Sequence, residues 1–145
     1  MMNILAILTW FTSRQDYLGK YANDDSAKKA ATKLWNAIDG DGWVPFLLMV
    51  LLTALIAWVY YFPVNNKPGR HYHPKWWGIF GVVTLAAVFA MTIVCCFFLA
   101  KSPGFDYGLI LKASGVNTLY AAVVYLLFSV IINRTGKSNA YPFPF

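Results

Sequence analysis

The chain has 145 residues, of which 59% are hydrophobic and only 12% are charged. Soluble domains carry roughly 25% charged residues, so this composition argues against a disordered tail, a nucleic-acid arm and an ordinary soluble enzyme domain. The formal charge of +6 comes from 12 Lys and Arg against six Asp, with no Glu. On so apolar a chain this excess is typical of basic side chains at lipid headgroups, and we expect no nucleic-acid partner.

The N-terminal region, residues 1–42, differs from the rest of the chain. Its first 11 residues are apolar, but about 17 Å of helix is too short to cross a bilayer. They also lack the basic start and small-residue cleavage site of a signal peptide. We therefore expect this short apolar segment to lie in the membrane interface or against a partner.

An amphipathic interfacial helix is predicted over about residues 24–39. Apolar residues recur there at steps of three and four from Ala27 to Ile38, with Asp24 among the capping candidates and Gly40 as the expected stop. On the opposite face, Lys28 and Lys29 are expected to anchor the helix at the headgroups.

Three uncharged runs are long enough to cross a bilayer, at residues 43–62, 76–100 and 116–133. The third extends back to residue 109 if Lys112 reaches the headgroups. Helices buried in a soluble core are the alternative, but three such runs leave too little polar sequence to cover one. The sequence therefore predicts an all-α integral membrane protein with a transmembrane domain over 43–133.

Aromatic residues flank the runs as an interfacial belt requires, and we interpret Trp43, Trp76 and Trp77 as interfacial anchors. Near the spans, five Lys or Arg residues lie on each side, so their distribution does not orient the chain. The lysines of the amphipathic helix favour a cytoplasmic N-terminus. We expect the plasma (inner) membrane as the location.

The three predicted spans contain no ionisable Asp, Glu, Lys, Arg or His. Proton relays, voltage sensors and intramembrane acid–base enzymes need such groups despite their cost, so this absence argues against all three. His71 and His73 are two ligands without the third that zinc requires. The adjacent Cys95 and Cys96 lie in an apolar run and are interpreted as packing residues. We predict neither a metal nor a cofactor.

The sequence Asp39-Gly40-Asp41-Gly42 has the composition of the opening of a calcium loop. Val44 stands where that loop requires glycine. We interpret the segment as the turn between the amphipathic helix and the first span.

The third span carries a stripe of small and hydroxyl side chains at steps of three and four residues. Such residues support close helix packing and interhelical hydrogen bonds in lipid. Three interpretations of the stripe are open. It packs against other helices of the same chain, it faces a symmetry axis or a water-filled path, or it contacts a different subunit. Shorter pairs occur at Thr53 with Ala57 and at Ala86 with Ala90. The stripe consists of Ser114, Thr118, Ala122, Tyr125 and Ser129.

The C-terminal tail, residues 134–145, is short and rich in aromatic residues and proline. Its aromatic side chains can act as anchors, and its prolines limit its conformational freedom. We predict that Tyr141, Phe143 and Phe145 dock into a groove on another subunit.

Two functions remain open. The first is a non-catalytic multi-pass subunit that anchors or assembles a larger membrane complex, with the lipid bilayer and itself or other membrane subunits as partners. The alternative is a small homo-oligomeric pore, either an ion channel or a holin-like or toxin-like permeabilising effector. A lipid-modifying enzyme is disfavoured because no nucleophile, base or metal cluster can be assigned.

Overall fold

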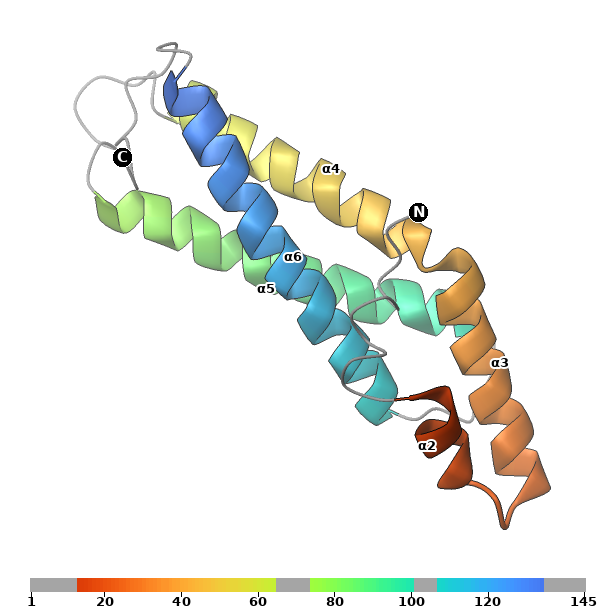
Figure 1. The fold of residues 1–145 in the computed structure, drawn as a ribbon. Helices are drawn as coiled ribbons and strands as arrows, with labels where there is room; N and C mark the ends of the chain where they lie inside the picture. The colour runs from red at the N-terminus through yellow and green to blue at the C-terminus, as the bar shows by residue number, and fades with distance from the viewer. Residues whose placement is uncertain (1–12, 65–73, 101–106, 135–145) are drawn as a thin grey trace. The chain divides into compact units, whose positions relative to one another are not determined.

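The computed structural model describes residues 13–64, 74–100 and 107–134, and every element of regular secondary structure in these ranges is a helix. This confirms the all-α fold class. Figure 1 shows the elements in chain order, coloured from red to blue. They are α2 (Arg14–Gly19), α3 (Asp25–Asp41), α4 (Trp43–Val59), the π-helical turn η1 (Tyr60–Val64), α5 (Pro74–Ala100) and α6 (Tyr107–Arg134).

Three stretches are long and apolar enough to cross a membrane: Trp43–Val64, Lys75–Phe98 and Tyr107–Ile132. Shorter helices precede them in the chain. Backbone groups in hydrocarbon must find their partners within the protein, and a continuous helix satisfies that demand. These stretches indicate an integral membrane protein surrounded by a lipid bilayer.

The third long helix begins earlier than the sequence predicted. It starts at Tyr107 rather than at 116 or 109, so residues 107–115, which lie between the second and third predicted runs, are helical. Leu109 and Ile110 are each 2% exposed and give this first part of α6 an apolar buried side. Lys112 is exposed, so its charge does not oppose the helix.

The first long helix ends in a widened turn. Proline has no N–H and its ring clashes with the carbonyl four residues earlier, and the first predicted span ends at residue 62, before Pro63. Instead η1 carries the chain through Pro63 to Val64. A π-helical turn accommodates the missing bond, and Tyr60 and Tyr61, both fully buried, hold it in place by packing.

The chain divides into two compact units. Unit 1 comprises Met1–Leu47 and Phe89–Asn117, and unit 2 comprises Leu48–Val88 and Thr118–Phe145. Each of α4, α5 and α6 contributes one part to each unit.

In unit 1, α2 packs against α3. The rings of Tyr17 and Trp35 have centroids 5.5 Å apart, and Arg14 donates a hydrogen bond to the side-chain oxygen of Asn36 at 3.3 Å. Buried Ala31, Leu34 and Ile38 lie on the same face of α3 as Trp35, as the predicted amphipathic pattern requires. The six-residue α2 was not predicted.

Helix α3 ends later than expected. Gly40 lies within it, and Gly42 is the C-cap, with φ −62° and ψ −12°. Both angles are helical, so α4 follows after a single residue. Asp39 and Asp41 are therefore part of α3 and do not form the predicted turn.

Asp24 caps the start of α3. Its carboxylate accepts hydrogen bonds from the backbone N–H groups of Ser26 and Ala27, at 2.9 and 3.1 Å, and from the Ser26 hydroxyl at 2.7 Å. These bonds favour the charged form, the Ser26 side-chain bond most strongly, and lower the pKa of Asp24 from its ordinary value of 3.8.

Acidification should therefore open the first turn of α3. Because the folded pKa of Asp24 is depressed, its stabilisation is present above pH 3.8 and is lost as the pH falls through that lowered pKa. Hydrogen exchange of the Ser26 and Ala27 amides should accelerate over this range. Asp24→Asn keeps a good N-cap without a titrating group, so its exchange should follow only the intrinsic pH dependence. Equal pH responses in both proteins would contradict the assignment.

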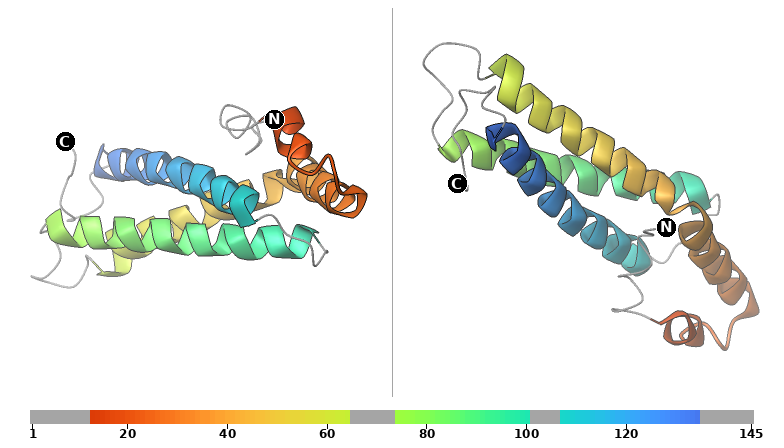
Figure 2. Two further views of the ribbon diagram at one scale, coloured as in Figure 1. Left: turned by 90° about the horizontal axis from the view of Figure 1, so that it is seen from below. Right: turned by 45° about the horizontal axis from the view of Figure 1, so that its top comes forward.

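In unit 2, α5 and α6 pack antiparallel. Trp77 contacts Ser129, and four residues further along α5, Gly81 lies against Tyr125. The residue numbers rise on one helix as they fall on the other. Figure 2 shows these parts of the two helices running side by side in opposite directions.

Candidate functional site

Two features of the long helices stand out as candidate sites. The first is a buried amide in unit 1, Asn117 of α6. The second, in unit 2, is an aromatic cluster beside an apolar groove between α5 and α6.

Asn117 ties three helices of unit 1 together. Its side-chain Nδ2 donates to the Thr92 hydroxyl of α5 at 2.7 Å and to the Pro45 carbonyl of α4 at 3.2 Å. Asn117 and Thr92 are both fully buried. Asn117 lies ten residues into α6, about 15 Å along its axis from Tyr107. In hydrocarbon, such interhelical bonds replace bonds that water cannot supply.

The local sequence explains this arrangement. Pro45 falls in the first turn of α4, where its missing N–H costs nothing, and a carbonyl oxygen has a second lone pair to accept the amide. The Asn117 Oδ1 is buried and has no hydrogen-bond partner among the described residues. The amide is thus half satisfied.

The aromatic cluster forms the core of unit 2. Its buried members are Ala57, Tyr60, Tyr61 and Tyr125. The ring of Tyr60 packs on Tyr61 and on Phe80, with centroids 4.8 and 5.0 Å apart. Because Tyr60 and Tyr61 belong to η1 and Tyr125 to α6, the cluster joins the end of the first span to the third.

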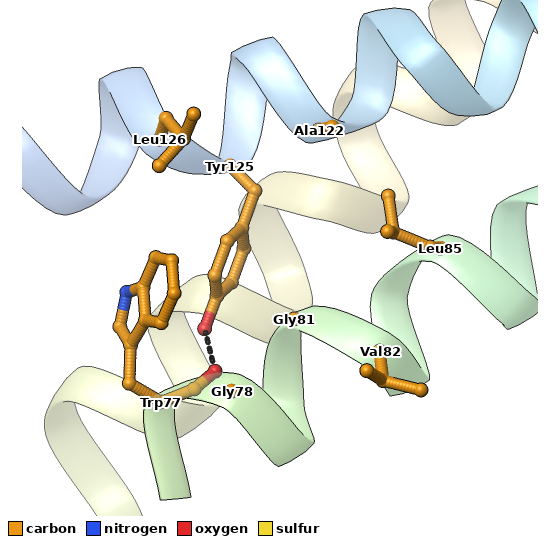
Figure 3. A pocket seen from close by; sticks show the side chains of 8 residues that line it. All are labelled: Trp77, Gly78, Gly81, Val82, Leu85, Ala122, Tyr125 and Leu126. Atoms are coloured by element: carbon orange, nitrogen blue, oxygen red, sulfur yellow. Dashed lines mark hydrogen bonds between the residues drawn. The ribbon is translucent and has the colours of Figure 1, made fainter. Parts of the chain in front are cut away.

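Two hydrogen bonds join α5 to α6 at the edge of this cluster. Tyr125 donates its hydroxyl proton to the Trp77 carbonyl at 3.1 Å, drawn as a dashed line in Figure 3. The Trp77 indole N–H donates to the Ser129 hydroxyl at 3.1 Å. Ser129 in turn donates to the Tyr125 backbone carbonyl at 2.8 Å. These three residues form a closed set of bonds between the two helices.

A groove of about 310 Å³ lies beside Tyr125. It exists because small residues line it: a Cβ added at Gly78 would meet nothing within 4 Å, while one at Gly81 would lie 3.4 Å from the Tyr125 ring. Figure 3 shows the lining side chains from both helices. The lining residues are Trp77, Gly78, Gly81, Val82, Leu85, Ala122, Tyr125 and Leu126.

The chemistry of these sites is that of packing and apolar binding. Within the ranges that the structure describes, no cluster of three or more His, Cys, Asp or Glu side chains is placed to hold a metal. Cys96 is buried, and the Cys95 thiol contacts the Met91 sulfur at 3.5 Å. Neither site presents a nucleophile beside a base.

The predicted stripe on α6 divides by burial. Ser114, Tyr125 and Ser129 are buried, whereas Thr118 and Ala122 are half-buried. The Ser114 hydroxyl donates to the carbonyl of Ile110, one turn earlier on its own helix, at 2.8 Å. Tyr125 and Ser129 belong to the bonded set in unit 2, and Ser114 belongs to unit 1.

The predicted anchors differ in exposure. Trp43 is 49% exposed, and Lys28 and Lys29 are exposed on α3. Trp76 and Trp77 are half-buried and pack against the aromatic cluster. Their role at a membrane interface stays a prediction.

Other predicted residues lie outside the described part of the chain. These are the apolar segment 1–11, the loop histidines His71 and His73, and the docking residues Tyr141, Phe143 and Phe145.

The sequence prediction missed Asn117. The prediction rests on ionisable groups in the spans, and the side chain of Asn is uncharged. The sequence nonetheless indicates it, because burying an amide in an apolar run is unfavourable in free energy unless the amide forms a hydrogen bond to another helix.

Comparison of the chain with known protein families, with curated proteins and with solved structures finds no match.

Proposed function

We propose that this chain is a non-catalytic multi-pass membrane subunit that anchors or assembles a larger complex, in the plasma (inner) membrane. The observation that carries the proposal is the small pair Ala86 and Ala90 on α5, both exposed. Small residues four apart let another helix approach closely, which is how helices associate in lipid. The comparable pair Thr53 and Ala57 is fully buried within the chain.

The surface of the spans supports this role. Only 28%, 22% and 28% of the most apolar windows of the three spans are buried inside the chain. Their exposed side chains include many large apolar residues, among them Leu51, Val82 and Leu119. Such faces suit lipid or other transmembrane helices, either from a second copy or from different subunits.

The hydrogen bonds that the hydroxyl groups of the stripe make within the chain favour this function over a homo-oligomeric pore. Ser114 and Ser129 both donate to carbonyls of their own helix, and the Tyr125 hydroxyl donates to Trp77. Hydroxyls used in this way supply few polar groups to a water-filled path. Packing within the chain is the interpretation of the stripe that these bonds favour.

The test is purification in mild detergent followed by native mass spectrometry. We expect other polypeptides to accompany the chain in a fixed ratio. Replacing both Ala86 and Ala90 by leucine overpacks the contact at about 1–3 kcal/mol, so the accompanying fraction should fall about tenfold. Gly115→Leu is the matched control, because a Cβ there meets nothing within 4 Å. A well-behaved monomer, or a homo-oligomer that conducts ions, would contradict the proposal.

A further inference from the structure

Helix α6 is longer than a bilayer requires. Its candidate span, Tyr107–Ile132, has 26 residues and is about 39 Å long, whereas the hydrocarbon core is about 30 Å thick. Only a tilt of about 40°, the upper limit for transmembrane helices, would bring all of it inside. About six of its residues therefore lie outside the hydrocarbon, and the charged residues of unit 1 indicate which end they belong to.

The contact between Asn117 and Pro45 gives a common height for two helices of unit 1. Successive membrane-crossing helices run in opposite directions, so α4 and α6 start on the same side of the bilayer. Lys112 lies five residues before Asn117, about 7.5 Å toward that side. Asp41 lies four residues before Pro45, about 6 Å toward the same side, because the helical angles of Gly42 continue the rise from α4 into α3.

Two charged side chains thus lie at nearly the same height on different helices. Lys112 and Asp41 are both exposed, and a charge in hydrocarbon is costly. A lysine can extend its amine toward the headgroups, but the short side chain of Asp41 cannot. Without its first six residues, up to Lys112, the 26-residue span of α6 retains 20, which is about 30 Å of helix. Charge and length therefore give the same boundary.

The apolar face of α3 is used within the protein. Leu34, Trp35 and Ile38 are all buried, and the Trp35 ring packs on Tyr17 of α2. A helix that lies in the membrane interface inserts its apolar face among the acyl chains. Because this face of α3 is already covered, other residues must contact the membrane surface.

We propose that the hydrocarbon begins at the height of Asp41 and Lys112, and that Trp43, Tyr107 and Lys112 form the surface that contacts the phospholipid headgroups. Trp43 is exposed two residues inside this height, and Tyr107, 64% exposed, lies five residues outside it. Tryptophan and tyrosine are enriched at the headgroup level. Helices α2 and α3 then lie on the aqueous side. This inference rests on membrane insertion and is independent of the proposed assembly role.

The test uses the full-length protein in lipid nanodiscs, which leave both bilayer faces open to solution. Cys95 and Cys96 are first replaced by alanine, and Tyr107, Leu111 or Leu119 is then replaced by cysteine. Reaction with a sulfonated maleimide is followed over time. Leu119 is exposed seven residues beyond Lys112, so it is the matched position inside the hydrocarbon.

We expect Tyr107→Cys and Leu111→Cys to react at similar rates, because helical side chains tilt toward the N-terminus, here away from the hydrocarbon. Maleimide reacts with the thiolate, and hydrocarbon disfavours a charge, so Leu119→Cys should react at least about 60-fold more slowly. Protection of Leu111→Cys to the level of Leu119→Cys would overturn the proposal, because the hydrocarbon would then begin above Lys112.

Tryptophan quenching tests the same boundary without cysteine substitutions. The contribution of Trp43 is the difference in fluorescence between the wild type and Trp43→Phe. Lipids brominated near the headgroup should quench this contribution more strongly than lipids brominated near the ends of their acyl chains. Stronger quenching by the deep bromines would contradict the proposal. Neither measurement needs another polypeptide, so failure of the proposed assembly role would leave both results unchanged.

Discussion

Replacing Tyr125 by alanine should lower the free energy of unfolding by about 3 kcal/mol. The Tyr125 side chain is 3% exposed and lies at the centre of the aromatic cluster, 5.5 Å from the Trp77 ring by centroids. In lipid no hydrophobic effect holds helices together, so the loss comes from the packing contacts of a whole ring. Equilibrium unfolding in mixed micelles, followed by tryptophan fluorescence, measures the change.

The matched variant is Tyr125→Phe, which keeps the ring and removes only the hydroxyl bond to the Trp77 carbonyl. Interhelical hydrogen bonds in membranes contribute about 0.6 kcal/mol on average, so this variant should lose well under half as much as Tyr125→Ala. If the two variants lost equal amounts, the hydrogen bond and not ring packing would be what joins α5 to α6.

Much of the fold follows from the amino-acid sequence because hydrocarbon restricts the choices so strongly. Uncharged runs of this length have no alternative to a helix in a bilayer, and the repeat from Ala27 to Ile38 gave α3 to within two residues at either end. The predicted ends of the helices were wrong where tertiary packing overrides the local preference of the sequence. Pro63 should end a helix, yet the buried Tyr60 and Tyr61 keep the chain in a π-helical turn.

The candidate sites were less accessible from the sequence. The four-residue spacing of Tyr125 and Ser129 placed both on one face of α6, and the two residues do share a bonded set. Their partner Trp77 could not be identified, because it lies 48 residues from Tyr125 along the chain. The groove could not be predicted from the sequence either, because it depends on which glycines of α5 face which residues of α6. Such pairings come from helix register, which periodicity within one helix does not contain.

Replacing Asn117 by aspartate should destabilise the protein by at least about 2.5 kcal/mol at pH 7, the lower range for a charge at the centre of a transmembrane helix. The introduced carboxyl has nearly the same shape but carries no amide donor for Thr92 Oγ1 and the Pro45 carbonyl. Burial disfavours the ionised carboxyl, so the loss should shrink as the pH falls and the group becomes neutral. Unfolding in mixed micelles at pH 7 and pH 4 measures both effects.

Asn117→Leu separates the cost of charge from the loss of the two hydrogen bonds. Leucine removes the donor, but it also removes the buried Oδ1 that has no partner among the described residues, so the two effects offset and the net change should stay within about 1 kcal/mol. The aspartate variant should therefore be much the less stable of the two at pH 7. Equal, small losses would mean that water reaches Asn117. A hydrated amide at this depth would favour a water-filled path, and with it the pore function, over a packed membrane subunit.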